Sequence, residues 1–294
     1  MKNSLELSYD KMKRSFLFFI FFLIANIGAT IYAQNLRQKP NDNSSTWQTF
    51  KYDTNASWRS IKHAVTRPLH WKGKDFTKFG GIVLGTVIIS ATDRETSNFF
   101  RQQDDSFPQP IQEFGFYFAS PQNYLMANAG LYGFGLLTKN EQIRKTSVLI
   151  ISSSITAGYL QIFARTAFGR ARPFSGDNHY TFKPFAGNED YLSFPSGHTV
   201  LGITMAHSIA KQFDNTWTKI GIYSIGSIPA LTRLMDGAHW LSDVVFGAAL
   251  SIVVVDSIDK FLFNSESYDY PKKQKIISWN FRFSGNQIGF VGTF

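Results

Sequence analysis

Residues 232–243 read T-R-L-M-D-G-A-H-W-L-S-D and lead into an apolar run at 244–255. In this stretch His239 follows Arg233 by six residues, and Asp243 follows His239 by four. If His239 opens a helix that continues through the apolar run, Asp243 lies beside it on one helical face. A carboxylate that accepts the Nδ1 proton leaves Nε2 unprotonated and nucleophilic. The same spacing is also typical of an ordinary polar helix face, so it decides nothing alone.

A second stretch, P-S-G-H-T at 195–199, separates a polar loop from an apolar run at 200–209. This placement predicts a helix start with Ser196 as its N-cap. Gly197 permits a close approach to the backbone, and His198 lies in the first turn. Because the N–H groups of a helix N-terminus are free, they suit a bound phosphate.

A third stretch, R-T-A-F-G-R-A-R-P at 165–173, follows an apolar run at 148–163 and carries Arg165, Arg170 and Arg172. The planar fork of arginine matches the oxygens of a phosphate. We expect Arg170 to cap the helix end and not to contact a substrate. The three stretches together supply an anion site, a candidate acid and an oriented nucleophile.

In this order and spacing, the stretches resemble the motifs K-x6-R-P, P-S-G-H and S-R-x5-H-x3-D of the type 2 phosphatidic acid phosphatase and vanadium haloperoxidase superfamily. The second motif is complete; Thr232 stands in the Ser position of the third, and Arg165 in the Lys position of the first. The resemblance implies His239, His198 and Asp243 as catalytic residues. It implies a phosphate-binding set of Arg165, Arg172, Ser196, Gly197 and Arg233.

The reaction implied by the resemblance is hydrolysis of a phosphate ester through a phosphohistidine. His239 attacks phosphorus, Asp243 stabilises the imidazolium that forms, and His198 protonates the leaving alkoxide. The arginines hold the charge of the transition state. We expect no metal ion and no other cofactor, because the residues offer no carboxylate cluster or H-E-x-x-H pattern.

Apolar periodicity predicts an all-α fold, a six-helix bundle of the type 2 phosphatidic acid phosphatase kind. The expected helices cover 77–92, 122–138, 146–168, 197–213, 216–235 and 239–262. The phosphatase domain is expected at 75–262, after a linker and docking segment at 34–74. Alternating residues around a Gly-Asn turn predict a short β-hairpin in the tail, 263–294.

The first 33 residues combine a basic start with an apolar stretch from Phe16 to Ala33. This pattern predicts a signal peptide cleaved after Ala33, with an uncleaved anchor as the alternative. Either way, the following chain is expected on the extracytoplasmic, periplasmic side of the cell envelope. The bundle is expected to touch the membrane peripherally, with full integration open, since the mean hydropathy is only −0.13.

The chain has a formal net charge of +9 and no cysteine, which excludes disulfides and thiolate metal sites. The charge favours anionic partners such as phospholipid head groups over nucleic acid, for which no binding motif is present. Three functions fit: a phosphatase for lipids such as phosphatidic acid, a polyprenyl diphosphate or lipid A; a soluble periplasmic acid phosphatase; and, more distantly, a vanadium haloperoxidase. A non-catalytic phosphate-binding envelope protein is the alternative of another class.

Overall fold

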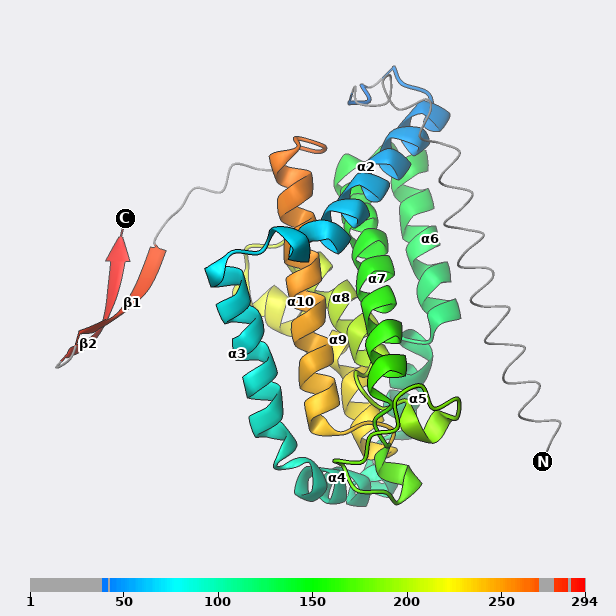
Figure 1. The fold of residues 1–294 in the computed structure, drawn as a ribbon. Coiled ribbons are helices and arrows are strands. Elements are labelled where there is room, and N and C mark those ends of the chain that lie inside the picture. The colour runs from blue at the N-terminus through cyan, green and yellow to red at the C-terminus, as the bar shows by residue number, and fades with distance from the viewer. Residues whose placement is uncertain (1–38, 42, 270–277, 285–286, 294) are drawn as a thin grey trace.

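The computed structural model describes residues 39–41, 43–269, 278–284 and 287–293. The signal peptide or anchor predicted at 1–33 lies outside these residues. The described residues contain nine α-helices (Figure 1). They are α2 Thr46–Thr66, α3 Gly73–Ser90, α4 Asp93–Gln102, α5 Gln109–Phe118, α6 Pro121–Leu137, α7 Glu141–Phe168, α8 Gly197–Ala210, α9 Thr216–Met235 and α10 Leu241–Asn264.

Six of these helices, α3 and α6 to α10, correspond to the predicted ones, with ends that differ by a few residues. The predicted count of six is too low, because α2, α4 and α5 also form. The polar helix α2 begins with a capping box in which Ser45 and Gln48 satisfy each other's backbone N–H groups. Such a box fixes a helix start that apolar periodicity does not reveal.

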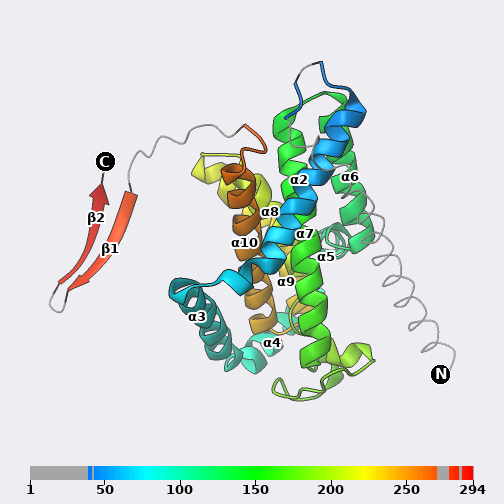
Figure 2. The same ribbon diagram turned by 45° about the horizontal axis from the view of Figure 1, so that its top comes forward.

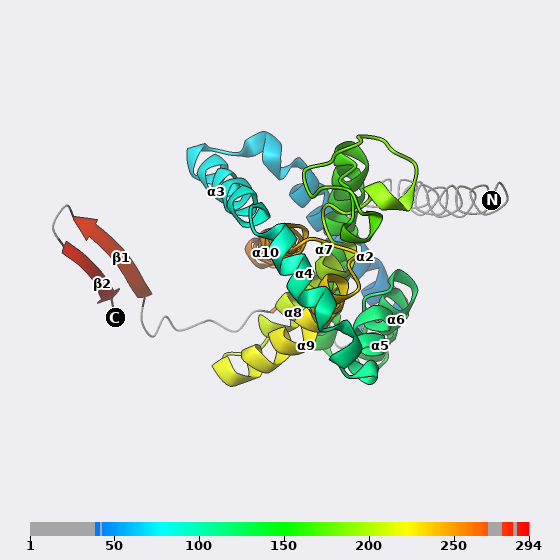
Figure 3. The same cartoon turned by 90° about the horizontal axis from the view of Figure 1, so that it is seen from below.

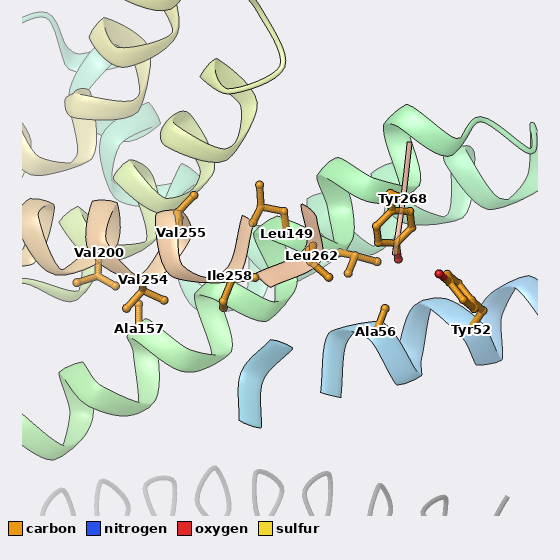
Figure 4. Packing of buried hydrophobic residues seen from close by; sticks show 11 residues of the cluster. Tyr52, Ala56, Leu149, Ala157, Val200, Val254, Val255, Ile258, Leu262 and Tyr268 are labelled. Atoms are coloured by element: carbon orange, nitrogen blue, oxygen red, sulfur yellow. The ribbon is translucent and has the colours of Figure 1, made fainter. Parts of the chain in front are cut away.

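The core forms where α7 runs between α2, α8 and α10 (Figures 1 and 2). Apolar side chains from α7 and α10 interleave there, with one face of α2 covering them (Figure 4). Leu149, Val255, Ile258 and Leu262 are fully buried. Burial of a side chain of this size contributes about 1.5 to 3 kcal/mol, so the helix contacts themselves stabilise the bundle.

A buried polar network joins α2 to α7 and to the segment after α10. Asp53 accepts hydrogen bonds from Arg144 Nε at 3.0 Å, Tyr132 Oη at 3.0 Å and Tyr268 Oη at 2.8 Å. Tyr52 donates to the carbonyl of Ser267 at 2.6 Å. Because every group in this network is paired, α2 is an integral part of the helical body.

Helix α4 crosses one end of the bundle (Figure 3). It follows α3 after a break of two residues, and the helical segments on either side of the break differ in direction by 63°. The pair Asp93-Arg94, which directly follows the helix expected at 77–92, begins α4. The bend brings a short polar helix across the bundle end.

Two helices of the described chain, α7 and α10, are long and apolar enough to cross a membrane, and the bent pair of α3 with α4 adds a third if it counts as one span. Large apolar side chains are exposed on several helices. They include Val83, Leu84, Val87 and Ile88 on α3, Leu125, Met126, Phe134 and Leu137 on α6, and Ile162 and Phe163 on α7. An exposed apolar surface of this extent marks contact with lipid or another apolar partner.

The tail contains two antiparallel strands, β1 Ser278–Ser284 and β2 Gln287–Thr293. Their register runs from Ser278 opposite Thr293 to Ser284 opposite Gln287. The Gly-Asn pair at 285–286, where we predicted the turn, lies outside the described residues.

Candidate active site

Three parts of the chain meet at one end of the bundle: the C-terminus of α7, the N-terminus of α8 and the link between α9 and α10 (Figure 1). The backbone N–H of Ser196 donates to the carbonyl of Asp243 at 3.3 Å. Gln161 of α7 donates to the carbonyl of Pro195 at 3.0 Å. These bonds bring together the three motifs, which are far apart in the sequence.

Gly169 ends α7 in the left-handed conformation, with φ of 58°. A Cβ atom at this position would lie only 1.8 Å from the carbonyl oxygen of Lys183. Only glycine fits there, since it tolerates positive φ and has no side chain. The chain therefore turns sharply after α7, and residues 170–196 fold back over the site.

His239 does not open a helix, which corrects the expected helical stacking with Asp243. Helix α10 begins at Leu241, with Trp240 as its N-cap. His239 Nδ1 lies 2.6 Å from the carbonyl oxygen of Ser193 and 3.8 Å from Asp243 Oδ2. Because a carbonyl only accepts, Nδ1 carries the proton and Nε2 is left unprotonated. The expected tautomer is thus held by a backbone group, with the carboxylate nearby.

Asp243 is fully buried, and its carboxylate contacts several residues of the site. Its carboxylate accepts hydrogen bonds from Ser193 Oγ at 2.5 Å and from the backbone N–H of Trp240 at 2.9 Å. It also forms an ion pair with Arg170 Nη1 at 2.6 Å. This carboxylate therefore caps α10, neutralises a buried arginine and lies near the imidazole of His239.

Arg170 is buried and does not cap the end of α7, contrary to the expectation. Its Nη2 forms an ion pair with Asp93 of α4 at 2.8 Å, and its Nε donates to the carbonyl of His179 at 2.9 Å. Asp93 in turn accepts from the hydroxyl and the backbone N–H of Ser242. Arg170 is thus shared by two buried carboxylates and leaves no free guanidinium edge for a substrate.

Ser196 is the N-cap of α8, as predicted, and its hydroxyl accepts from the backbone N–H of Thr199. A Cβ at Gly197 would lie 3.3 Å from a terminal nitrogen of Arg165, which is a tight contact. The guanidinium of Arg165 therefore lies against the first turn of α8. Arg165 Nε is buried and has no hydrogen-bond partner among the described residues.

His198 and Arg233 likewise carry buried nitrogens without a partner in the described chain, at Nε2 and Nε. Burial lowers the pKa of His198 to about 4, with further lowering by the nearby charges of Arg233 and His239. The other end of the Arg233 guanidinium pairs with Asp236 at 2.7 Å. At neutral pH, His198 is therefore an uncharged imidazole beside cations.

Helix α5, which the sequence did not predict, forms one wall of the site. Gly115 allows it to approach α9, because a Cβ there would lie 2.5 Å from the side chain of Thr232. The next residue, Phe116, places its ring 4.9 Å from the guanidinium carbon of Arg233 and 5.9 Å from the ring of His198. An aromatic face favours a neighbouring cation.

Arg172 donates from Nε to the carbonyl of Glu189 at 2.8 Å. Burial lowers the pKa of Arg172 and the pKa of Arg233. The positive charge of Arg233 lowers the pKa of Arg172 further. His239 feels the charges of Arg172 and Arg165, although burial is the main cause that lowers its pKa to about 4. The structure thus brings together all of the predicted site residues around one cationic centre, the arginine cluster of Arg165, Arg172 and Arg233.

Sequence reasoning did not identify Asp93, Ser193 and Ser242 as parts of the site. The carbonyl of Ser193 contacts His239, and its hydroxyl donates to Asp243. Asp93 and Ser242 form hydrogen bonds with each other and with Arg170. No spacing rule reveals them, since Asp93 lies on a different helix. Among the described residues, no group of three His, Cys, Asp or Glu side chains is arranged to hold a metal ion.

Comparison with known proteins gives a family match over the second half of the chain. Residues 146–264 match the model of the PAP2 superfamily. The lipid A 1-phosphatase of Porphyromonas gingivalis is 28% identical over 132 residues, which cover 44% of this chain and 27% of that protein. The lipid A 1-phosphatase of Rhizobium etli is 34% identical over 103 residues, which cover 34% of this chain and 43% of that protein. The match thus spans less than half the length of each relative.

Among solved structures, the crystal structure of Aquifex aeolicus LpxE is similar with a TM-score of 0.43 and 20% sequence identity. The superposition covers 55% of this chain and 93% of that one.

Proposed function

We propose that this chain is a phosphatase of the PAP2 superfamily, whose model matches residues 146–264, and that it removes a phosphate from a lipid without a metal ion. The proposed catalytic residues are His239, His198 and Asp243. The proposed phosphate-binding groups are Arg165, Arg172, Arg233 and the backbone at Ser196 and Gly197. We propose residues 75–262, as predicted from the sequence, as the phosphatase domain, with α2 packed on it as part of the same helical body.

One observation carries this proposal: three buried nitrogens of the same centre, Arg165 Nε, Arg233 Nε and His198 Nε2, have no partner among the described residues. An unpaired buried polar atom costs about 1 to 3 kcal/mol, so a native protein keeps such atoms for a reason. Two of them belong to arginines and the third to a histidine held neutral beside these cations. A phosphate anion accepts from both guanidinium nitrogens, and its charge favours the protonated form of His198, whose Nε2–H then donates to it as well.

In the proposed reaction, the arginine cluster binds the equatorial oxygens of the phosphate. His239 Nε2 attacks phosphorus in line with the leaving oxygen, and the ester bond breaks as the N–P bond forms. His198 gives a proton to the leaving alkoxide. Ser193 and Asp243 stabilise the imidazolium that His239 becomes. In the second step, water attacks phosphorus as the N–P bond breaks, and His198 takes the proton of the water. Inorganic phosphate leaves, and His239 returns to its neutral form.

The proposed substrate is a phosphorylated lipid, and three arguments support this choice. Apolar side chains are exposed along α3, α6 and α7, which suits a surrounding membrane better than water. Helices α7 and α10 have the length and composition of membrane spans. The relatives from Porphyromonas gingivalis and Rhizobium etli are lipid A 1-phosphatases. We propose an enzyme integrated in the membrane, with its site on the extracytoplasmic side, acting on a glycolipid phosphate of the lipid A kind.

Phosphate release by the purified full chain in EDTA tests the proposal. We expect release from lipid A in detergent micelles, with p-nitrophenyl phosphate turned over at least about tenfold less efficiently, because remote contacts with the lipid contribute to the transition state. Phosphatidic acid serves as a second lipid substrate. Equal turnover of the small ester would support a soluble-type acid phosphatase, and loss of activity in EDTA would contradict the metal-independent mechanism.

We expect kcat/KM to be bell-shaped, with its optimum on the acid side of neutrality. In the free protein, burial lowers the pKa of both His239 and His198 to about 4. Below that pH, His239 gains a proton and cannot attack. Above about pH 6, the phosphate ester loses its second proton. Neither the ester nor the neutral His198 then supplies the proton that the leaving group needs.

The profile is measured as kcat/KM, which reports the free enzyme and free substrate, and as kcat, which reports the complex. A bound anion stabilises protonated His198, so we expect the alkaline limb of kcat at a higher pH than that of kcat/KM. A profile that is flat from about pH 5 to pH 9 would contradict the roles given to these histidines.

A further inference from the structure

A polar cleft lies beside the proposed active site. It has a volume of about 350 Å³ and lies between α4 and the loop that follows Arg172. Its lining includes Arg94, Ser97, Asn98 and Arg101 from α4, with Asn178 and Trp240 on the other side. None of the residues assigned to phosphate binding above lines this cleft.

The α4 side of the cleft is a single helical face, because Arg94, Ser97, Asn98 and Arg101 are spaced by three, four and seven residues. Phe99 lies on the opposite side of the helix, and 59% of its surface is exposed. Helix α4 crosses the bundle end (Figure 3). Its polar face lines the cleft, and Phe99 on the opposite side of the helix does not. This is the arrangement of a helix at a membrane surface.

The cleft is cationic, and its cations are available. Within the described part of the chain, neither Arg94 nor Arg101 has an ion pair or a hydrogen bond from its side chain. Arg101 lies against Gly237, where a Cβ would approach its side chain to 3.1 Å. The acidic residue of the lining, Asp177, already accepts a hydrogen bond from Tyr191 Oη at 2.6 Å. Two unpaired guanidinium groups that face one cleft suit the oxygens of a phosphate, which accept hydrogen bonds from their N–H groups.

The cleft and the active site share a wall. Trp240, which lines the cleft, directly follows His239, and its indole N–H donates to the carbonyl of Ala171 at 2.7 Å. Pro173 of the lining directly follows Arg172, and the next residue, Phe174, donates its backbone N–H to the carbonyl of Gly237. One amphiphile with two anionic groups therefore has a binding group for each of them at this end of the bundle.

We propose that this cleft binds a second phosphate of the same lipid molecule while the first phosphate occupies the arginine cluster. The proposal rests on the proposed function, since it assigns a substrate with two phosphate groups to that site. It predicts a preference for bisphosphorylated glycolipids over forms that carry only the phosphate that is removed.

The test compares a disaccharide lipid that carries a phosphate at each end with its two monophosphate forms, in neutral detergent micelles. The double variant Arg94→Gln/Arg101→Gln is expected to raise KM for the bisphosphate about tenfold, through the loss of charge-assisted hydrogen bonds. The kcat of the double variant stays unchanged, and so does its KM for the monophosphate that carries only the phosphate to be removed. The matched control Lys78→Gln removes an exposed cation of α3 and leaves all values unchanged.

Three outcomes would overturn the proposal: equal KM values for the two substrates in the wild type, an equal fall in kcat for both in the double variant, or a preference that arises only when anionic lipid is added to the micelles. Equilibrium binding to the His239→Ala variant separates this proposal from the proposed function. If the wild type releases no phosphate, the cleft is still supported when the bisphosphate binds more tightly than the monophosphate and this difference disappears on replacing Arg94 and Arg101. Equal binding of both lipids overturns it.

Discussion

Replacement of His239 by alanine is expected to lower kcat for phosphate release on the order of 10⁴-fold or more, the size of effect seen when a covalent nucleophile is removed. The side chain is 98% inaccessible in the fold, yet its Nε2 is unprotonated and adjoins the arginine cluster, so it has the lone pair that the reaction needs. Phosphate release from a lipid substrate measures the effect. A wild-type enzyme quenched during turnover is expected to carry an acid-labile phosphate that the variant lacks.

The matched control is His207→Ala. This histidine lies on α8 as His198 does, but it contacts Tyr223 and Asp256, outside the arginine cluster. We expect the control to retain its activity and the His239 variant to retain its thermal unfolding midpoint to within a few degrees. A folded His239→Ala protein that keeps activity within tenfold of the wild type would exclude His239 as the nucleophile.

Replacement of Arg170 by methionine is expected to cost about 3 to 5 kcal/mol of stability. Its guanidinium pairs with Asp93 at 2.8 Å and with Asp243 at 2.6 Å, and both carboxylates are fully buried. Without the arginine, two buried negative charges stay close together with no cation. The thermal unfolding midpoint in detergent is expected to fall on the order of 10 °C.

Two further variants make this test specific. Arg67→Met removes one partner of an exposed ion pair with Asp75 at 3.8 Å, which is worth at most about 1 kcal/mol. Arg170→Lys keeps the charge but loses the planar fork, and is expected to restore part of the stability. If Arg170→Met unfolds at the same temperature as Arg67→Met, the buried network does not hold the site together.

The sequence alone determined the longest helices and the members of the proposed site. Helices α7 and α10 carry long apolar runs, and such runs need no tertiary information to indicate a helix. The helix start at Ser196 was also predicted, because a local N-cap rule applies to neighbouring residues. The residues of the proposed site were predicted from the resemblance of three short motifs, each with a fixed internal spacing, and the fold brings them to one end of the bundle.

Only the tertiary structure decided which hydrogen-bond and ion-pair partners the site residues have. The sequence predicted that His239 and Asp243 would pair on one helix. That helix begins at Leu241, two residues after His239, and the carbonyl of Ser193 is the closer partner of the imidazole. Helix α4 was missed because its first residues, Asp93 and Arg94, are charged and follow an apolar helix. Asp93 contributes to the site through Arg170, which lies 77 residues further along the chain. Ion pairs between residues so distant in sequence depend on the packing of helices, and no local pattern of residues encodes that.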